Sequence, residues 1–385
     1  MVNKKEKMPL SGVIVLDMTS VLSGPFATSI LGDLGAKIIK IEKPDGDDSR
    51  KFGPFINKKS CYFVSLNRGK KSIVLNLKNN KDKLIFSELL EKADVLIDNY
   101  KPGVLEKFGF SWKYLNKNYP KLIHSKISGF GETGPLNNAP AYDIIVQAIG
   151  GVMSITGSDK KNIARVGTSI GDITASLFCV IGVLSQLIFR NRVNRGSKLD
   201  LSMLDCQVAI LENAIARYSV EKKNPFPLGT DHPSITPFGS FDTLNEKIVI
   251  AIGNEKLFKN FCEAINDEEM LTMKIFNSNL NRNKNIKKLR IRIENILKKN
   301  KASYWLKKFR EKGVPSAKIN NISDLINNPQ VKYRNMIVDY KDRFIKKLKL
   351  PGNPLKFSFS KDKKVAEAAP DLNENKKEIL KLLRD

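Results

Sequence analysis

Short apolar runs alternate with helical patterns through the first half of the chain. Their lengths and their content of β-branched residues are typical of buried strands. The expected strands cover residues 13–16, 37–41, 72–77, 95–97, 122–128 and 196–202. Helical patterns separate several of them, as at residues 26–34 and 80–92. Strands that alternate with helices predict βαβ units, so we expect an α/β fold with a parallel sheet.

The pattern changes after a linker marked by Pro225, Pro227 and Gly229. Two short strand patterns follow, and then helical patterns over residues 256–265, 286–299 and 303–312. The sequence therefore predicts a smaller α+β domain. We place the first part of the large domain at residues 1–222, the small domain with its linkers at 223–325, and the return to the large domain at 326–385. A helix over 373–383 is expected to dock on the large domain.

The turns that follow the predicted strands carry residues suited to ligand binding. They are the segments 19–25, 67–71, 98–103 and 129–131, which are rich in Gly, Asn and Lys. Ligands of open parallel sheets bind beyond the carboxyl ends of the strands, so these turns predict one shared ligand surface. The run at 67–71 is either a phosphate site or a solvated charge run. No GxGxxG motif is present, so a nicotinamide cofactor is not supported.

Asp172 stands at the start of a long apolar run, residues 173–189, and follows Gly167 and Gly171. An Asp in such a place is commonly a helix N-cap, because its carboxylate accepts the unpaired amide protons of the first turn. It is alternatively a nucleophilic carboxylate presented at a helix start. The local pattern leaves both readings open.

Charge and composition narrow the class of protein. The net charge is +26, from 66 basic and 40 acidic residues, but Lys is spread over the whole length without a nucleic-acid motif. We therefore predict no nucleic-acid partner, while the basic field suits a polyanionic ligand. The four cysteines lie far apart without a CxxC pair, and only two histidines are present. These counts argue against a disulfide framework and a metal site.

The sequence also bears on location. The basic N-terminus lacks a cleavage pattern, and Asp17 interrupts the apolar segment behind it, so we expect no signal peptide. The run 173–189 approaches spanning length but holds Thr174, Ser185 and Gln186. A buried core helix is the favoured interpretation. We predict a soluble, cytoplasmic protein without a membrane partner.

Taken together, the motifs and their order resemble the class III CoA-transferases, the family of formyl-CoA transferase, carnitine CoA-transferase and the α-methylacyl-CoA racemases. The resemblance covers nearly the whole chain, and its specificity comes from the order of the motifs. The motifs are Leu10-Ser11-Gly12-Val13-Ile14-Val15-Leu16-Asp17, Gly24-Pro25, Leu31-Gly32-Asp33-Leu34-Gly35-Ala36, Lys40-Ile41-Glu42-Lys43-Pro44, Asn67-Arg68-Gly69-Lys70-Lys71-Ser72, Asp98-Asn99-Tyr100-Lys101-Pro102-Gly103 and Ser128-Gly129-Phe130-Gly131.

This resemblance implies an interlocked homodimer, with a Rossmann-like large domain built from both chain ends. It implies that Asp172 is the catalytic carboxylate and passes through an aspartyl anhydride and an aspartyl–CoA thioester. The substrates would be an acyl-CoA and a small carboxylic acid, with no permanently bound cofactor and no metal. The CoA contacts would map onto Val21, Leu22, Ser23, Lys43, Asn99, Tyr100 and Lys107, with Arg68 and Lys71 near a further basic contact.

The racemase branch of this family needs a His and Asp pair to move a proton next to the thioester. Here Tyr142 precedes Asp143 where that branch has His, which is similar to the transferase branch. His124 lies inside a strand pattern and is expected to be structural. His232 lies in the linker and is either a substrate-pocket residue or a loop residue. We favour CoA transfer over racemisation.

Segments 231–238, 313–315 and 328–331 resemble the branch that uses succinyl-CoA and other dicarboxylic acyl groups. Leu372-Asn373-Glu374-Asn375 departs from the family, where Leu-Gly-Glu-His is common. The non-enzyme alternative is a CoA-binding or nucleic-acid-binding protein. Asp172 and its glycine setting argue against that alternative.

Overall fold

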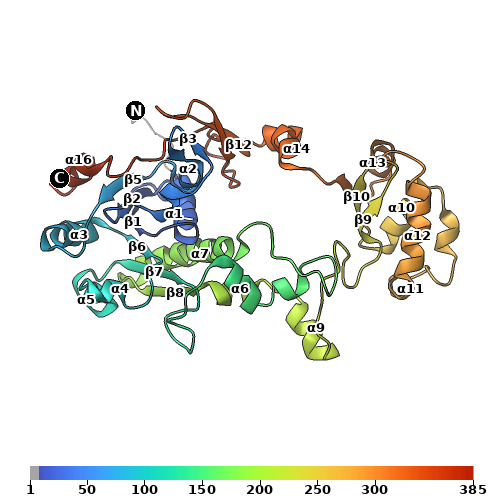
Figure 1. Cartoon of the computed structure of the whole chain (residues 1–385), viewed down its shortest axis with the longest axis horizontal. Helices are drawn as coiled ribbons and strands as arrows, with labels where there is room; N and C mark the ends of the chain where they lie inside the picture. The colour runs from blue at the N-terminus through green and yellow to red at the C-terminus, as the bar shows by residue number, and fades with distance from the viewer. Residues whose placement is uncertain (1–7, 385) are drawn as a thin grey trace. The chain divides into compact units, whose positions relative to one another are not determined.

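The computed structural model describes residues 8–384, and its larger unit is built on a six-stranded parallel sheet. The strand order is β5-β2-β1-β6-β7-β8, which confirms the predicted α/β class. The strands are β1 (Ile14–Met18), β2 (Lys37–Glu42), β5 (Lys71–Val74), β6 (Val95–Asp98), β7 (Ile123–Ser128) and β8 (Lys198–Ser202). The chain reverses its direction of progress between β1 and β6, because β2 and β5 extend to one side and β6, β7 and β8 to the other (Figure 1). Such a switch point is where open parallel sheets bind ligands.

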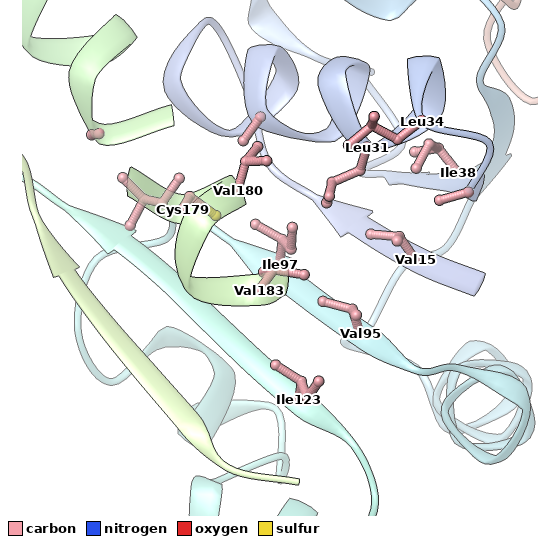
Figure 2. Packing of buried hydrophobic residues seen from close by; sticks show 14 of the residues in the cluster. Val15, Leu31, Leu34, Ile38, Val95, Ile97, Ile123, Cys179, Val180 and Val183 are labelled. Carbon is pink, nitrogen blue, oxygen red and sulfur yellow. The ribbon is translucent and has the colours of Figure 1, made fainter. Parts of the chain in front are cut away.

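Two hydrophobic clusters lie on the opposite faces of this sheet. One joins helices α1 (Ser23–Asp33) and α7 (Ile170–Val193) to strand side chains such as Val15 and Ile97, and Figure 2 shows this packing. The other joins helices α3 (Asn80–Lys92), α5 (Trp112–Asn118) and α16 (Lys376–Lys381) to strand side chains such as Leu16 and Ile73. Val15 and Leu16 are adjacent and completely buried, because consecutive side chains of a strand point to opposite faces. Burial of both faces explains why the strands read as continuous apolar runs.

Helices cover the sheet and its edges. From the N-terminus to residue 221 they are α1 (Ser23–Asp33), α2 (Cys61–Asn67), α3 (Asn80–Lys92), α4 (Val104–Lys107), α5 (Trp112–Asn118), α6 (Asp143–Ile149), α7 (Ile170–Val193), α8 (Met203–Ala209) and α9 (Ala214–Glu221). Helices α8 and α9 are separated near Glu212, whose φ is 54°. Such a left-handed residue ends a helix, which is why α8 and α9 are separate.

The C-terminal segment belongs to the larger unit. It contains α15 (Pro329–Tyr333), β12 (Ile337–Tyr340), β13 (Leu348–Pro351), β14 (Val365–Ala366) and α16 (Lys376–Lys381), and a short hairpin near the N-terminal part pairs β3 (Phe55–Ile56) with β4 (Lys59–Ser60). Asn373 adopts φ 62°, a value that glycine adopts more readily. Asn373 and Asn375 accept the amide protons of Val74 and Ser72 on the edge strand β5. The departure from the family motif thus supplies edge-strand contacts.

The smaller unit comprises residues 153–164 and 220–327. Its antiparallel sheet has the order β11-β10-β9. Its elements are β9 (Phe238–Asp242), β10 (Lys247–Ala251), α10 (Glu255–Ala264), α11 (Asn279–Lys284), α12 (Ile286–Leu297), α13 (Ala302–Glu311), β11 (Ser316–Lys318) and α14 (Ile322–Asn327). Side chains of the sheet and of α10, α12 and α13 form a separate hydrophobic core. Residues 153–164 also belong to this unit, although no pattern in the sequence indicated it.

Helix α7 was expected to be a buried core helix, and one side of it is. Ala175, Cys179 and Val183 are buried against the sheet. The opposite side is exposed in the single chain and includes Ile181 and Ile188. Within the described residues α7 is the one helix long and apolar enough to cross a membrane, and 33% of its most apolar stretch is buried.

Candidate active site

A cavity of about 510 Å³ opens beyond the carboxyl ends of β1, β2, β6 and β7. It brings together three of the four turns expected to share a ligand surface, those after β1, β6 and β7. Eight residues predicted for the site line it, namely Val21, Leu22, Ser23, Lys43, Asn99, Tyr100, Tyr142 and Asp172. Residues separated by as many as 151 positions, such as Val21 and Asp172, therefore share one concave surface. The location agrees with the general rule for parallel sheets.

Asp172 is the third residue of α7, and Ser169 occupies the N-cap position without a side-chain capping bond. The interpretation of Asp172 as an N-cap is therefore wrong. Burial and the neighbouring charge of Asp143 raise the pKa of Asp172 to about 6, against hydrogen bonds from the side chain and backbone of Ser23. A helix start favours the ionised form of a carboxylate. Burial and the like charge nevertheless raise the pKa of Asp172, so this carboxylate is more basic than an exposed one and is still mostly ionised at pH 7.

Asp143 was missed as a site residue by the sequence reasoning. It opens α6, and its Oδ1 accepts the amide proton of Gly171 at 2.8 Å, next to Asp172. Its Oδ2 accepts a hydrogen bond from Gln147 Nε2 at 2.7 Å, and Gln147 Oε1 accepts the amide proton of Val166 at 2.9 Å. Asp143 thus supplies from another helix the cap that α7 lacks. The only local signal was an Asp in the first turn of a predicted helix, which is common.

The charge of Asp143 makes a prediction for the pH profile. The hypothesis that the ionised Asp172 is the nucleophile predicts that kcat/KM falls as the pH drops below about 6. Asp143→Asn removes the like charge and keeps an oxygen for the Gly171 amide. We expect the acidic limb of kcat/KM to move to lower pH, because the pKa of Asp172 falls. A limb that stays in place or moves to higher pH would contradict this electrostatic role.

The turn between β1 and α1 is held by buried polar groups. Asn99 accepts the amide proton of Ser20 at 2.9 Å and donates to the Ser20 carbonyl at 2.8 Å. Val21 adopts φ 70°, a left-handed value that is strained for a β-branched residue. Ser176 Oγ donates to the carbonyls of Ser23 and Asp172, at 2.6 and 2.7 Å. A turn fixed in this way presents its backbone to the cavity in one conformation.

The basic residues predicted to contact CoA have different surroundings. Lys43 lies at the cavity, is about half exposed and pairs with Asp48 at 2.7 Å. Arg68 makes a two-pronged ion pair with Asp33 and lines a second cavity of about 400 Å³. Lys71 pairs with Glu378 at 3.3 Å. Lys107 ends α4 and is not among the residues lining the larger cavity. The CoA contacts of these four residues stay predictions.

The two histidines lie in different units. His124 is buried in β7, and its Nε2 lies 2.7 Å from Asp98 Oδ2. Asp98 Oδ1 accepts the amide proton of Tyr100 at 3.1 Å. The His124–Asp98 pair thus helps to fix the turn at Asn99 and Tyr100. His232 belongs to the smaller unit, packs against Phe238 and accepts the amide proton of Ser234 at 3.1 Å. Its predicted place in a substrate pocket stays a prediction. Within the described residues no cluster of three or more His, Cys, Asp or Glu is arranged to hold a metal ion.

Comparison with known proteins gives one consistent answer. The model of CoA-transferase family III matches residues 10–376. The acetyl-CoA:oxalate CoA-transferase of Acetobacter aceti is 42% identical over 96% of this chain and 94% of that protein. The succinyl-CoA:glutarate CoA-transferase of Mus musculus is 36% identical over 97% of this chain and 86% of its own length. A CaiB/BaiF family protein from Brucella suis has a similar structure, with 32% identity, a TM-score of 0.87, and coverage of 98% of this chain and 100% of that one.

The structure is an α/β fold with a cavity at the switch point of a parallel sheet. The family match then fixes the class, and the chain belongs to CoA-transferase family III. It is a CoA-transferase, and its relatives are CoA-transferases that act on dicarboxylates. CoA-transferases use CoA thioesters as substrates.

Proposed function

We propose that this enzyme moves CoA from a donor acyl-CoA to a dicarboxylic acid, with Asp172 as the nucleophile. The observation that carries the proposal is the position of Asp172, which lies in the cavity, is held by Ser23, and has a raised pKa. A carboxylate with a pKa of about 6 is still mostly ionised at pH 7, and it is more basic than an ordinary Asp. Both properties suit attack on a thioester carbonyl.

The proposed reaction has four displacements. The Asp172 carboxylate attacks the donor thioester, and the CoA thiolate leaves to give a mixed anhydride. The thiolate then attacks the aspartyl carbonyl, which releases the donor acid and forms an aspartyl–CoA thioester. The acceptor carboxylate attacks this thioester, expels the thiolate and forms a second anhydride. Finally the thiolate attacks the acceptor's acyl carbonyl and returns Asp172 as a free carboxylate, so no proton or cofactor is consumed.

The turns around the cavity are suited to the CoA moiety. Lys43 and Lys101 are the cations that line it, and phosphate groups bind ammonium groups and helix N-termini. Val21 and Leu22 offer apolar surface beside the polar backbone of the first turn. We place CoA along Val21, Leu22, Ser23, Lys43, Asn99 and Tyr100, with its sulfur toward Asp172. Tyr142, which is 76% exposed in the single chain, is placed at the acyl end.

The substrate proposal rests on the relatives, which are named for oxalate, glutarate and other dicarboxylates. The test is a matrix of donors (acetyl-CoA, succinyl-CoA) and acceptors (oxalate, glutarate, acetate), with new acyl-CoA followed by liquid chromatography. We expect transfer to at least one dicarboxylate, and none or far less to acetate. Preferred transfer to acetate would contradict the substrate proposal. The racemase alternative needs a His and Asp pair, and Tyr142 stands where that branch has His.

We further propose that the working enzyme is an interlocked homodimer. The single chain exposes large apolar side chains on three helices, including Ile145 on α6, Leu177, Ile181 and Ile188 on α7, and Ile215 on α9. Monomeric proteins rarely expose large apolar patches, and the exposed side of α7 alone carries several such side chains. A second copy of the chain is the occupant that the family resemblance implies.

The homodimer makes a prediction for α7. Size-exclusion chromatography with light scattering should give about twice the chain mass of 43.3 kDa. The Ile181→Glu/Ile188→Glu variant places two charges seven residues apart on one face of α7, and it should give monomer with little activity. The matched control is Leu84→Glu, an equally exposed apolar residue of α3. A wild-type enzyme that is fully active as a monomer would contradict the proposal.

A further inference from the structure

The turn between β1 and α1 is held by a single buried carboxylate, and no family motif assigned this residue to the site. Asp47 is 4% exposed, and its Oδ1 accepts four hydrogen bonds. The donors are Ser20 Oγ at 2.9 Å, the Val21 amide at 3.1 Å, the Ser49 amide at 2.8 Å and Ser49 Oγ at 2.7 Å. Its Oδ2 lies 2.8 Å from Lys40 Nζ, which also donates to the Thr19 carbonyl at 2.9 Å.

Residues that follow two different strands thereby both form hydrogen bonds with Ser20. Asp47 follows β2 and binds the Ser20 side chain, while Asn99 follows β6 and binds both backbone groups of Ser20. Val21 comes next, in a left-handed conformation that the Asp47 bond to its amide stabilises. A β-branched residue keeps such a conformation only where its surroundings impose it. The three residues Asp47, Ser20 and Asn99 are called the turn clamp below.

The residue two places beyond Val21 touches the nucleophile. Ser23 is the first residue of α1 and lines the cavity with Asp172, and Ser176 Oγ bridges the carbonyls of the two residues. Hydrogen bonding by Ser23 lowers the pKa of Asp172 against the larger effect of burial. The position of the Ser23 donors depends on the path that the chain takes through Ser20 and Val21. We propose that Asp47 is a positioning residue for catalysis, which acts through the turn clamp to aim Ser23 at Asp172. The proposal deepens the proposed function, since it rests on Asp172 as the nucleophile.

A test of this role must separate the charge of Asp47 from its effect on the position of Ser23, because several charged groups surround Asp47 and Asp172. Asp172 is faced by Asp143 on α6. Burial raises the pKa of Tyr62 on α2, and the charges of Asp172, Asp47 and Asp143 raise it further. Asp47 is faced by Lys40, and its backbone amide donates to Glu42. Removing Asp47 alone would take away the carboxylate that Lys40 contacts, leaving the charges of Asp17 and Glu42 near Lys40, and would also change the field at Asp172. Removing Asp47 and Lys40 together takes away one charge of each sign, so both effects nearly cancel.

The experiment measures the acidic limb of kcat/KM in Lys40→Met, Lys40→Met/Asp47→Ala, Ser23→Ala and the triple variant. Ser23→Ala removes a donor that favours the ionised Asp172. The acidic limb of its kcat/KM profile should therefore move to higher pH by about one unit, which corresponds to a tenfold higher proton affinity of Asp172. Lys40→Met/Asp47→Ala should show a similar rise relative to the parent enzyme, because the pair is removed without a change of net charge. Lys40→Met alone keeps the four bonds to Asp47 and reports what the loss of Lys40 contributes. Adding Ser23→Ala should then raise the limb no further, because Asp47 acts through Ser23.

Two outcomes overturn the role of Asp47. One is an acidic limb of Lys40→Met/Asp47→Ala that stays where the parent enzyme has it, even if thermal stability falls. The other is a full addition of the Asp47 and Ser23 effects, which would mean that they act independently. An Asp172→Asn enzyme that remained active would instead overturn the proposed function. If Asp172→Asn is inactive and the limb does not move, only the inference about Asp47 fails.

Discussion

Asp172→Asn is expected to abolish CoA transfer, with kcat lowered by at least about 10³-fold. The amide has nearly the shape of the carboxylate but cannot form the anhydride, because it is a far weaker nucleophile. Its side chain still fits the pocket beside Ser23, and Asn lacks the like charge that opposes Asp143. We therefore expect the variant to be at least as stable as the parent in thermal unfolding.

The control for this variant is Asp205→Asn. Asp205 also lies in the first turn of a helix, α8, but it is exposed and does not line the cavity. It should keep the parental kcat. An Asp172→Asn enzyme with kcat within tenfold of the parent would mean that another group attacks the thioester, and the proposed mechanism would then fall.

Lys70→Met should have the largest effect on stability, with a loss of about 3–5 kcal/mol in the free energy of unfolding. Lys70 Nζ is buried and lies within 3.0 Å of Asp17 Oδ2, the Pro25 carbonyl, Thr28 Oγ1 and Asn67 Oδ1. Burial lowers the pKa of Lys70 to about 8, although Asp17 opposes this change. Removing the ammonium takes one donor from each of these acceptors and leaves Asp17 without its nearest cation. Denaturant titration measures the loss.

Lys71→Met is the matched control, one residue further along the chain. Lys71 is 41% exposed and pairs with Glu378, so its removal should cost no more than about 1 kcal/mol. The pair of variants also tests the phosphate-site hypothesis for the run 67–71. A raised KM for acyl-CoA in Lys71→Met, at unchanged stability, would support that hypothesis. Equal stability losses in both variants would contradict the structural role of Lys70.

The sequence predicted the sheet because its central strands are buried on both faces and read as apolar runs. It also predicted the surface that the strand ends form, including Val21, Asn99 and Asp172, because parallel strands place their carboxyl ends at one edge. The partners of those residues were not predictable. Asp47 and Asp143 bind backbone amides that are distant in sequence, at Val21 and Gly171. No local pattern encodes such a contact.

The basic run at residues 67–71 shows a second limit of sequence reasoning. Its three cations look alike in sequence, yet Lys70 is buried in an ion pair, Arg68 is held by Asp33, and Lys71 lies near the surface. Their difference arises because Lys70 immediately precedes β5, beneath the first turn of α1. Helix α7 is a similar case, because its apolar sequence predicted burial but not which side the single chain would leave exposed.

The most direct test of the central claim is mass spectrometry of the enzyme after incubation with acyl-CoA and hydroxylamine. An anhydride or thioester at Asp172 is trapped by hydroxylamine as an aspartyl hydroxamate. We predict this modification on the peptide that contains Asp172, only when acyl-CoA is present, and not in Asp172→Asn. An active enzyme that turns over acyl-CoA with an unmodified Asp172, or with the hydroxamate on another carboxylate, would contradict the account.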